Sequence, residues 1–293
     1  MTECPGKSNA ARFEDDGHLI KPSGIEIGKM RRNDCFNYLE NILARRSVGR
    51  ILRRFLHPQH ILTAQLDVRQ AYNLWAPTYV EETLPRHIDD ELACAMLQGL
   101  PQAHLLDAGC GTGGRISNIP GATGIDLSPA MLSAGGLHTV VAGDIREMPF
   151  ASGQFDMVWC RLVLGYLRDP LPAYREFYRV CMPGGYVFVT DFHPDATRAG
   201  HRRTFNDHNG IVHEIESYEH TNHAEAAMKA GLELIATRDG AVGPSVREFY
   251  IRGIGRKAYI RDFGLNLVEA YLFRRPVNIC CDANVVPHLN NGN

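Results

Sequence analysis

The chain has 293 residues, a formal net charge of −2 and 44% hydrophobic residues, which suffice for a sizeable core. The nearly balanced charge gives no reason to expect a nucleic-acid partner. No apolar run approaches the ~20 residues that span a bilayer, and the start MTECPGKSNA lacks the apolar centre of a secretory signal, so we expect a cytoplasmic protein.

We expect residues 1–66 to form an N-terminal extension, with a disordered start followed by basic amphipathic helices. Residues 29–56 carry eight Lys or Arg against two acids, and their apolar residues recur at helical spacing. Such a basic face attracts an anionic membrane surface or an acidic carrier protein, but charged helix faces are more commonly just exposed to solvent. The arginines of this face are Arg45, Arg46, Arg50, Arg53 and Arg54.

A helix is expected next, with Asp89 and Asp90 at its start and Gly99 at its end. The following stretch, HLLDAGCGTGG, joins an apolar strand, residues 104–108, to an acid and a glycine-rich turn. Glycines in such a turn remove the side chains that would keep backbone amides away from a ligand. The sequence therefore predicts a nucleotide-cofactor loop.

Two more acids follow at the ends of predicted strands. Asp126 ends the run ATGID, and Ser128 with Pro129 is typical of a helix start. Asp144 ends the run TVVAGD. Because successive strand ends of a doubly wound sheet meet at one crevice, we expect Asp107, Asp126 and Asp144 to line a single cleft.

The remaining elements alternate strand and helix. Apolar runs predict strands at 155–160, 186–192, 232–240 and 267–275, and helical spacing predicts helices at 171–181 and 221–231. Together with the three earlier strands this gives an α/β fold with a seven-stranded sheet.

In order and spacing, the segments LDAGCGTG, GIDLSPAML, AGDIREMPF, FDMVWC and RVCMPGGYVFVTD resemble the class I S-adenosylmethionine-dependent methyltransferases over residues 67–192. In detail the sequence resembles the small-molecule branch that includes quinone-pathway enzymes and the carrier-protein methyltransferase of biotin synthesis. The resemblance implies a doubly wound, seven-stranded, mostly parallel sheet, the Rossmann-like methyltransferase fold. It places this domain at 67–276, cap segments at about 193–220 (inserted after the fifth strand) and 240–264, and a tail at 277–293.

The resemblance also implies a cofactor, S-adenosylmethionine, and a site. AYNLWAPTY, residues 71–79, is similar to the segment that covers the cofactor in this branch. RISNIPG, residues 115–121, is shorter than the family's usual first helix, so we expect that helix to be trimmed by about one turn, ~4 residues. The expected cofactor-binding residues are Tyr79, Asp107, Gly109, Gly111, Gly113, Asp126, Leu127, Asp144, Ile145 and Arg161.

Histidines gather after the fifth predicted strand, and none of them forms the HExxH spacing of a metal site; the eight cysteines include no CxxC pair. We therefore expect no metal. His193 directly follows the strand, where its side chain could remove a proton from a methyl acceptor. His213 and His220 are weaker candidates for such a base, and Tyr166 is a candidate for the pocket wall.

The expected function is transfer of the methyl group of S-adenosylmethionine to an oxygen or carbon of a small, fairly apolar metabolite, free or presented on a carrier. Three alternatives stay open. One is N-methylation of a macromolecular amine, although the Asn/Asp-Pro-Pro-Tyr/Phe tetrapeptide of such enzymes is missing. Gly109, Gly111 and Gly114 also fit the GxGxxG of an NAD-dependent dehydrogenase. A non-catalytic cofactor-binding regulator is the third.

Overall fold

The computed structural model describes residues 19–20, 26–27, 65–79 and 83–277. The chain divides into two compact units, Met1–Ile61 and Leu62–Asn293. In the first unit the description covers an antiparallel strand pair, β1 (Leu19–Ile20) and β2 (Glu26–Ile27). The basic helices predicted over 29–56 and the tail from residue 278 lie outside the described residues.

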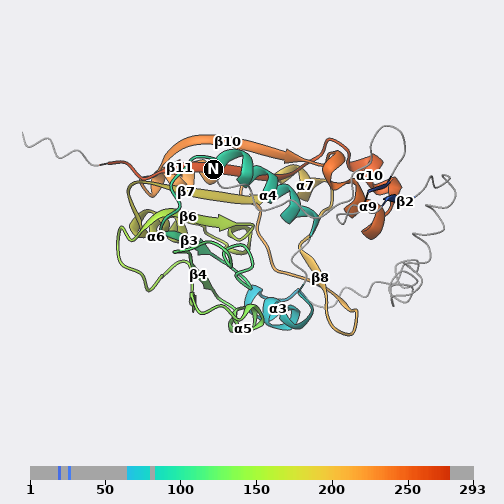
Figure 1. Cartoon of the computed structure of the whole chain (residues 1–293), viewed down its shortest axis with the longest axis horizontal. Helices are drawn as coiled ribbons and strands as arrows, with labels where there is room; N and C mark the ends of the chain where they lie inside the picture. The colour runs from blue at the N-terminus through green and yellow to red at the C-terminus, as the bar shows by residue number, and fades with distance from the viewer. Residues whose placement is uncertain (1–18, 21–25, 28–64, 80–82, 278–293) are drawn as a thin grey trace, which may run out of the picture. The chain divides into compact units, whose positions relative to one another are not determined.

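The second unit is built on a seven-stranded sheet in the order β10-β11-β7-β6-β3-β4-β5 (Figure 1). β11 runs antiparallel to β7 and β10, and the other neighbouring strands are parallel. This confirms the predicted doubly wound, mostly parallel sheet. Its strands are β3 (Leu105–Ala108), β4 (Thr123–Asp126), β5 (Val140–Ala142), β6 (Phe155–Arg161), β7 (Cys181–Phe192), β10 (Glu233–Ala241) and β11 (Asn266–Arg274).

Helices cover both faces of the sheet because successive strand residues point to opposite sides. Leu106 and Val158 pack with α6 (Leu171–Val180) and α8 (His223–Lys229). Leu105 and Met157, one residue earlier on the same strands, pack with α4 (Leu84–Leu97) and α7 (Pro194–Arg198) instead. The order of strands reverses between β3 and β6, which is the position where ligands bind in such sheets.

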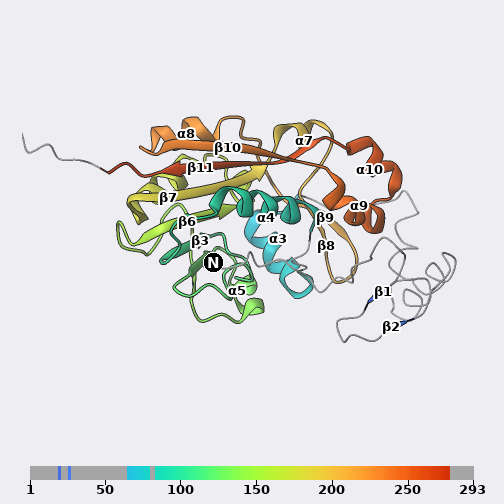
Figure 2. The ribbon, with the colours of Figure 1, turned by 45° about the horizontal axis from the view of Figure 1, so that its top comes forward.

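The remaining elements lie at the carboxyl ends of the parallel strands or connect them (Figure 2). Ala71, Phe205 and Ile215 form a small core of their own, in which the Trp75 and Phe205 rings stack with centroids 5.1 Å apart. These elements are α3 (Val68–Trp75), η2 (Ala76–Thr78), α5 (Pro129–Gly135), η3 (Leu164–Tyr166), β8 (Thr204–Asn206), β9 (Val212–Glu214), η4 (Pro244–Val246), α9 (Arg247–Gly253) and α10 (Arg256–Asp262).

The start of α4 differs from the prediction. The helix begins at Leu84, where the Thr83 side chain accepts a hydrogen bond from the Arg86 amide and Pro85 lies in the first turn. Asp89, predicted at the helix start, therefore lies inside the helix and is completely buried.

The helix expected after the glycine loop is missing rather than trimmed. Residues 109–121 form successive turns, with amide-to-carbonyl hydrogen bonds from Gly113 to Cys110, from Ile116 to Gly113 and from Ile119 to Ile116. Two adjacent glycines at 113–114 and Pro120 leave too few residues for a stable helical turn. Ile116 is nevertheless buried in the core, so the shortened connection still closes that face of the sheet.

Asp89 fastens α4 to the sheet through buried charges. Its carboxylate lies 2.8 Å from Arg161 Nη2 and 3.2 Å from Arg115 Nη2, and it accepts a 2.7 Å hydrogen bond from the Thr190 hydroxyl. Burial alone would raise its pKa, but the Arg161 and Arg115 guanidinium groups outweigh burial and lower it. The contribution of this carboxylate to stability is therefore present above the ordinary pKa of 3.8 and lost as pH falls through the lowered pKa.

We predict that Asp89→Ala lowers the free energy of unfolding by ~3–5 kcal/mol, because it removes the buried carboxylate that pairs with the Arg115 and Arg161 guanidinium groups. Asp90→Ala is the matched control: Asp90 also contacts Arg161, but its side chain is 50% exposed, so the expected loss is under ~1 kcal/mol. Urea denaturation at neutral pH measures both. Equal losses for the two variants would contradict this account.

Candidate active site

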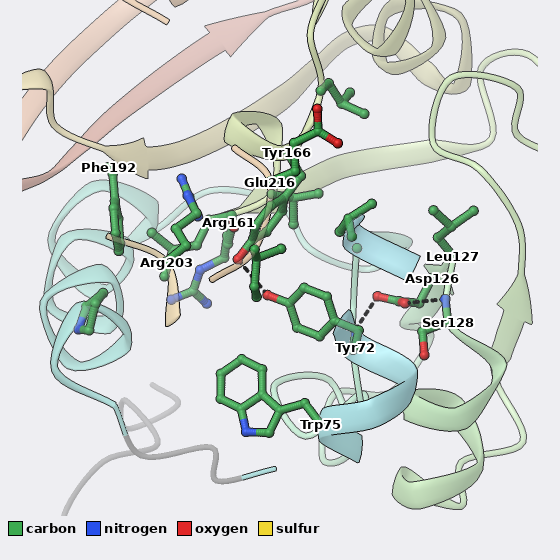
Figure 3. Close-up of a pocket in the computed structure, with 18 of the residues that line it drawn as sticks. Tyr72, Trp75, Asp126, Leu127, Ser128, Arg161, Tyr166, Phe192, Arg203 and Glu216 are labelled. Atoms are coloured by element: carbon green, nitrogen blue, oxygen red, sulfur yellow. Dashed lines mark hydrogen bonds between the residues drawn. The ribbon is translucent and has the colours of Figure 1, made fainter. Parts of the chain in front are cut away.

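A cavity of about 550 Å³ opens where the parallel strands end (Figure 3). One wall consists of the residues that follow β3, β4, β5 and β6, and the opposite wall of α3 and residues after β7. Eight of the expected cofactor-binding residues line it: Tyr79, Gly109, Gly111, Asp126, Leu127, Asp144, Ile145 and Arg161. Asp107 and Gly113 are not among the lining residues.

The glycine turn has a backbone that other residues rarely adopt. Gly109, Gly111 and Gly113 have φ angles of 85°, 59° and 75°. At Gly109 a Cβ atom would lie 2.4 Å from Val163 Cγ2, so the turn leaves no room for a side chain. Gly114, which the dinucleotide spacing requires, has no such positive φ.

Asp126 is held by two backbone amides. Its Oδ2 accepts from the Gly111 N–H and its Oδ1 from the Ser128 N–H, both at 2.8 Å. Burial raises its pKa, and these two hydrogen bonds oppose the rise. Each carboxylate oxygen has a second lone pair, so Asp126 can still accept a hydrogen bond from each of two neighbouring hydroxyl groups. This is the arrangement that a ribose needs.

Asp144 is engaged by its own neighbour. Arg146 donates to both of its oxygens, with Nη2 2.6 Å from Oδ2 and Nε 3.0 Å from Oδ1, and this hydrogen bonding lowers the pKa of Asp144. A contact between Asp144 and an adenine amino group would therefore have to share these oxygens with Arg146. Leu127 and Ile145 contribute apolar surface to the same part of the wall.

Asp107 belongs to β3 and does not line the cavity, so the expectation that three carboxylates line a single cleft is wrong. It is completely buried, and neither oxygen has a hydrogen-bond partner among the described residues. Burial raises its pKa, against the opposing effect of Arg115 and Arg161. An orphaned carboxylate beneath a bare peptide turn fits a site that takes a cationic ligand.

Arg161 has a structural role that the sequence did not reveal. Its guanidinium is buried, pairs with Asp89 and Asp90, and lies 5.3 Å from the centroid of the Trp159 ring. Leu162, the next residue, is the one non-glycine in the described ranges with a positive φ, 62°. Its amide donates to the Thr190 carbonyl at 2.8 Å, which holds this strained turn at the end of β6.

The wall opposite the glycine turn is aromatic and includes a buried cation. The Tyr72 and Tyr166 hydroxyls are 2.8 Å apart, and burial, reinforced by Tyr166, raises the pKa of Tyr72. Arg203 pairs with Asp191, and its guanidinium lies 4.6 Å from the Tyr166 ring and 4.2 Å from the Phe192 ring. Sequence reasoning missed Tyr72, which AYNLWAPTY contained, and Arg203, which carried no sequence signal.

Comparison with known proteins agrees with this geometry. Residues 106–189 match the family described as a methyltransferase domain. This part of the chain is therefore a methyltransferase domain. A solved S-adenosylmethionine-dependent methyltransferase from Mesorhizobium loti has the same fold, with a TM-score of 0.50 and 17% identity over 64% of this chain and 98% of that one.

Two curated relatives of this methyltransferase domain have named substrates. Malonyl-[acyl-carrier protein] O-methyltransferase of Dechloromonas aromatica (strain RCB) is 33% identical over 57% of this chain and 66% of its own length. Cycloartenol-C-24-methyltransferase 1 of Oryza sativa subsp. japonica is 28% identical over 56% of this chain and 53% of its own length. The chain thus spans between half and two thirds of the length of these relatives.

The methyltransferase domain brings a different histidine to its cavity than expected. His193 does not line it: Nδ1 accepts a hydrogen bond from the Asp195 amide at 3.0 Å and so caps α7. His201 lines the cavity, with Nε2 3.4 Å from Asp262 Oδ2. The weaker candidates are also engaged, His213 with Asp207 and His220 with the Leu167 carbonyl.

The expectations about metal ions and membrane spans can be compared with the part of the chain that the structure describes. No group of three or more His, Cys, Asp or Glu side chains there could hold a metal ion. Within the same ranges, no helix combines the length and apolarity that crossing a bilayer requires.

We predict that Asp126→Ala weakens binding of S-adenosylhomocysteine by ~1–3 kcal/mol, or ~5–150-fold, because the ribose loses its acceptor. Asp144→Ala is the control with a smaller expected effect, because Arg146 already occupies both Asp144 oxygens. Titration calorimetry measures both, and circular dichroism verifies that the variants fold. Wild-type affinity in a folded Asp126→Ala protein would refute the ribose assignment.

Proposed function

We propose that the protein transfers the methyl group of S-adenosylmethionine to an oxygen or carbon atom of a small, largely apolar metabolite, free or presented on a carrier. One observation carries the proposal: a single cavity joins the glycine turn and Asp126 to an aromatic wall formed by Tyr72, Trp75 and Phe192. Because both sets of residues line the same cavity, a cofactor and an acceptor placed in it would lie side by side (Figure 3).

The cofactor supplies an electrophilic methyl group on a sulfonium, and the protein positions the two reactants and excludes water from them. Orienting the two reactants in line accounts for a large part of the acceleration of such a displacement. Aromatic faces suit this task, because they attract a nearby cation and exclude water. The hydrogen bond between Tyr72 and Tyr166 fixes two of these rings relative to each other across 94 positions of sequence.

The relatives support both the acceptor atom and the form of the acceptor. One relative is named as an O-methyltransferase of a carrier-bound malonyl group and another as a C-methyltransferase of a sterol. The proposed partners of this chain are accordingly a small-molecule acceptor and, for delivery, an acidic carrier protein or an anionic membrane surface contacted by residues 29–56. A cytoplasmic location is part of the same proposal.

We expect a labelled product when the protein is incubated with methyl-labelled S-adenosylmethionine and a metabolite extract and the mixture is analysed by mass spectrometry. The Asp126→Ala variant should label the same product more slowly. Binding of S-adenosylhomocysteine without any product would favour a cofactor-binding regulator, and binding of NAD in its place would favour a dehydrogenase. A labelled macromolecular amine would instead indicate N-methylation.

His201 is the proposed base for an acceptor that must lose a proton. Asp262, its neighbour, is buried and also accepts a 3.1 Å hydrogen bond from the Tyr250 hydroxyl, so its position is fixed. Burial lowers the pKa of His201 below its ordinary value of 6.5, against the opposing effect of Asp262. The imidazole is therefore neutral at pH 7 and able to accept a proton.

We predict that His201→Gln slows methylation of a phenol or carbon acceptor by ~100 to 10,000-fold, and that the wild-type rate falls only as pH drops below 6.5. His193→Gln is the matched control and should retain the wild-type rate. Both effects are measured as methylation rates between pH 5 and 9, with the acceptor that the labelling experiment identifies. A normal rate in His201→Gln combined with a loss in His193→Gln would return the role to His193.

A further inference from the structure

The segment from Arg247 to Gly264 exposes several large apolar side chains. Ile251, Ile254, Ile260 and Phe263 are 37%, 60%, 64% and 57% exposed. They belong to α9, α10 and the residues that directly follow these helices. We call these four side chains the apolar ridge. So much apolar surface in thirteen residues is more than a solvated helix pair needs, and it marks an interaction surface.

The segment that carries the apolar ridge also carries an excess of positive charge. Five exposed cations accompany one exposed acid, Glu248, since Asp262 is buried. The chain as a whole is slightly acidic, with a net charge of −2, so this local excess is not a property of its composition. The cations are Arg247, Arg252, Arg256, Lys257 and Arg261.

The ridge borders the cavity. Ile254 is exposed and also lines the cavity, and Asp262 of α10 lies against the cavity residue His201. In both views α9 and α10 lie together beyond the end of β10 and the start of β11 (Figures 1 and 2). An apolar molecule that is released from a partner bound at the ridge could therefore enter the cavity past Ile254.

We propose that the apolar ridge inserts into the headgroup region of an anionic membrane and that the acceptor enters the cavity from that surface. Isoleucine and phenylalanine side chains suit the boundary between headgroups and acyl chains, while the flanking cations attract anionic lipids. An acidic protein would pair with the cations but would also need an apolar groove to cover four large side chains. The proposal rests on the proposed function for its second part only, because membrane binding itself requires no methyl transfer.

The test is co-sedimentation of the full chain with phosphatidylcholine vesicles, with and without phosphatidylglycerol. Binding should require phosphatidylglycerol and should fall ~10-fold or more in Arg256→Glu/Lys257→Glu and in Ile260→Ser/Phe263→Ser. Matched controls are Arg175→Glu/Arg238→Glu, at exposed cations elsewhere, and Leu234→Ser/Ile235→Ser, at exposed apolar residues of β10. These controls should bind like the wild type.

Three results would overturn the proposal. The wild-type chain could fail to bind vesicles, the ridge variants could bind as well as the controls, or the chain could bind an acyl carrier protein through the ridge and not vesicles. Affinity for S-adenosylhomocysteine, measured on the same variants, separates failure of the membrane-binding proposal from failure of the proposed function. Ridge variants that keep that affinity but lose vesicle binding confirm membrane binding by the ridge, whereas vesicle binding without any methyl transfer removes the proposed function and the second part of this proposal.

Discussion

The arrangement of the site depends on the two hydrogen bonds that Asp126 accepts from the backbone. Through the Gly111 amide, Asp126 fixes the glycine turn, and through the Ser128 amide it fixes the start of α5. The Ser128 hydroxyl in turn donates to Asn73 at 2.6 Å, which ties α3 to the same point. One carboxylate thus positions the turn, the wall beside it and the segment that closes the cavity.

Two buried acids, each paired with arginine, support the two halves of the cavity. Asp89 holds Arg161 and Arg115 beneath the glycine turn, and Asp191 holds Arg203 beneath the aromatic wall. Buried pairs of this kind stabilise little by comparison with apolar packing, but they are costly to break, so they specify one arrangement of the chain. Arg203 also donates to the Leu162 carbonyl, at 3.2 Å, which connects the cap to the strained turn at the end of β6.

The sequence predicted what short-range patterns encode. Strands such as Phe155–Arg161 are continuous apolar runs, and Ser128 with Pro129 forms a helix start within a few residues, so both were found. The side chains that depend on distant partners were missed or misplaced. Arg203 acquires its role from Asp191 and two aromatic rings, and the direction of His193 depends on whether it caps α7 or faces the cavity. The short length of residues 115–121 predicted a trimmed helix after the glycine turn but not that the helix would disappear.

A crystal structure of the chain with S-adenosylhomocysteine tests the central claim most directly. The account predicts one carboxylate oxygen of Asp126 at hydrogen-bond distance from each ribose hydroxyl, with the sulfur facing Tyr72 and Tyr166. A ligand bound elsewhere, or a ribose that makes no contact with Asp126, would contradict it.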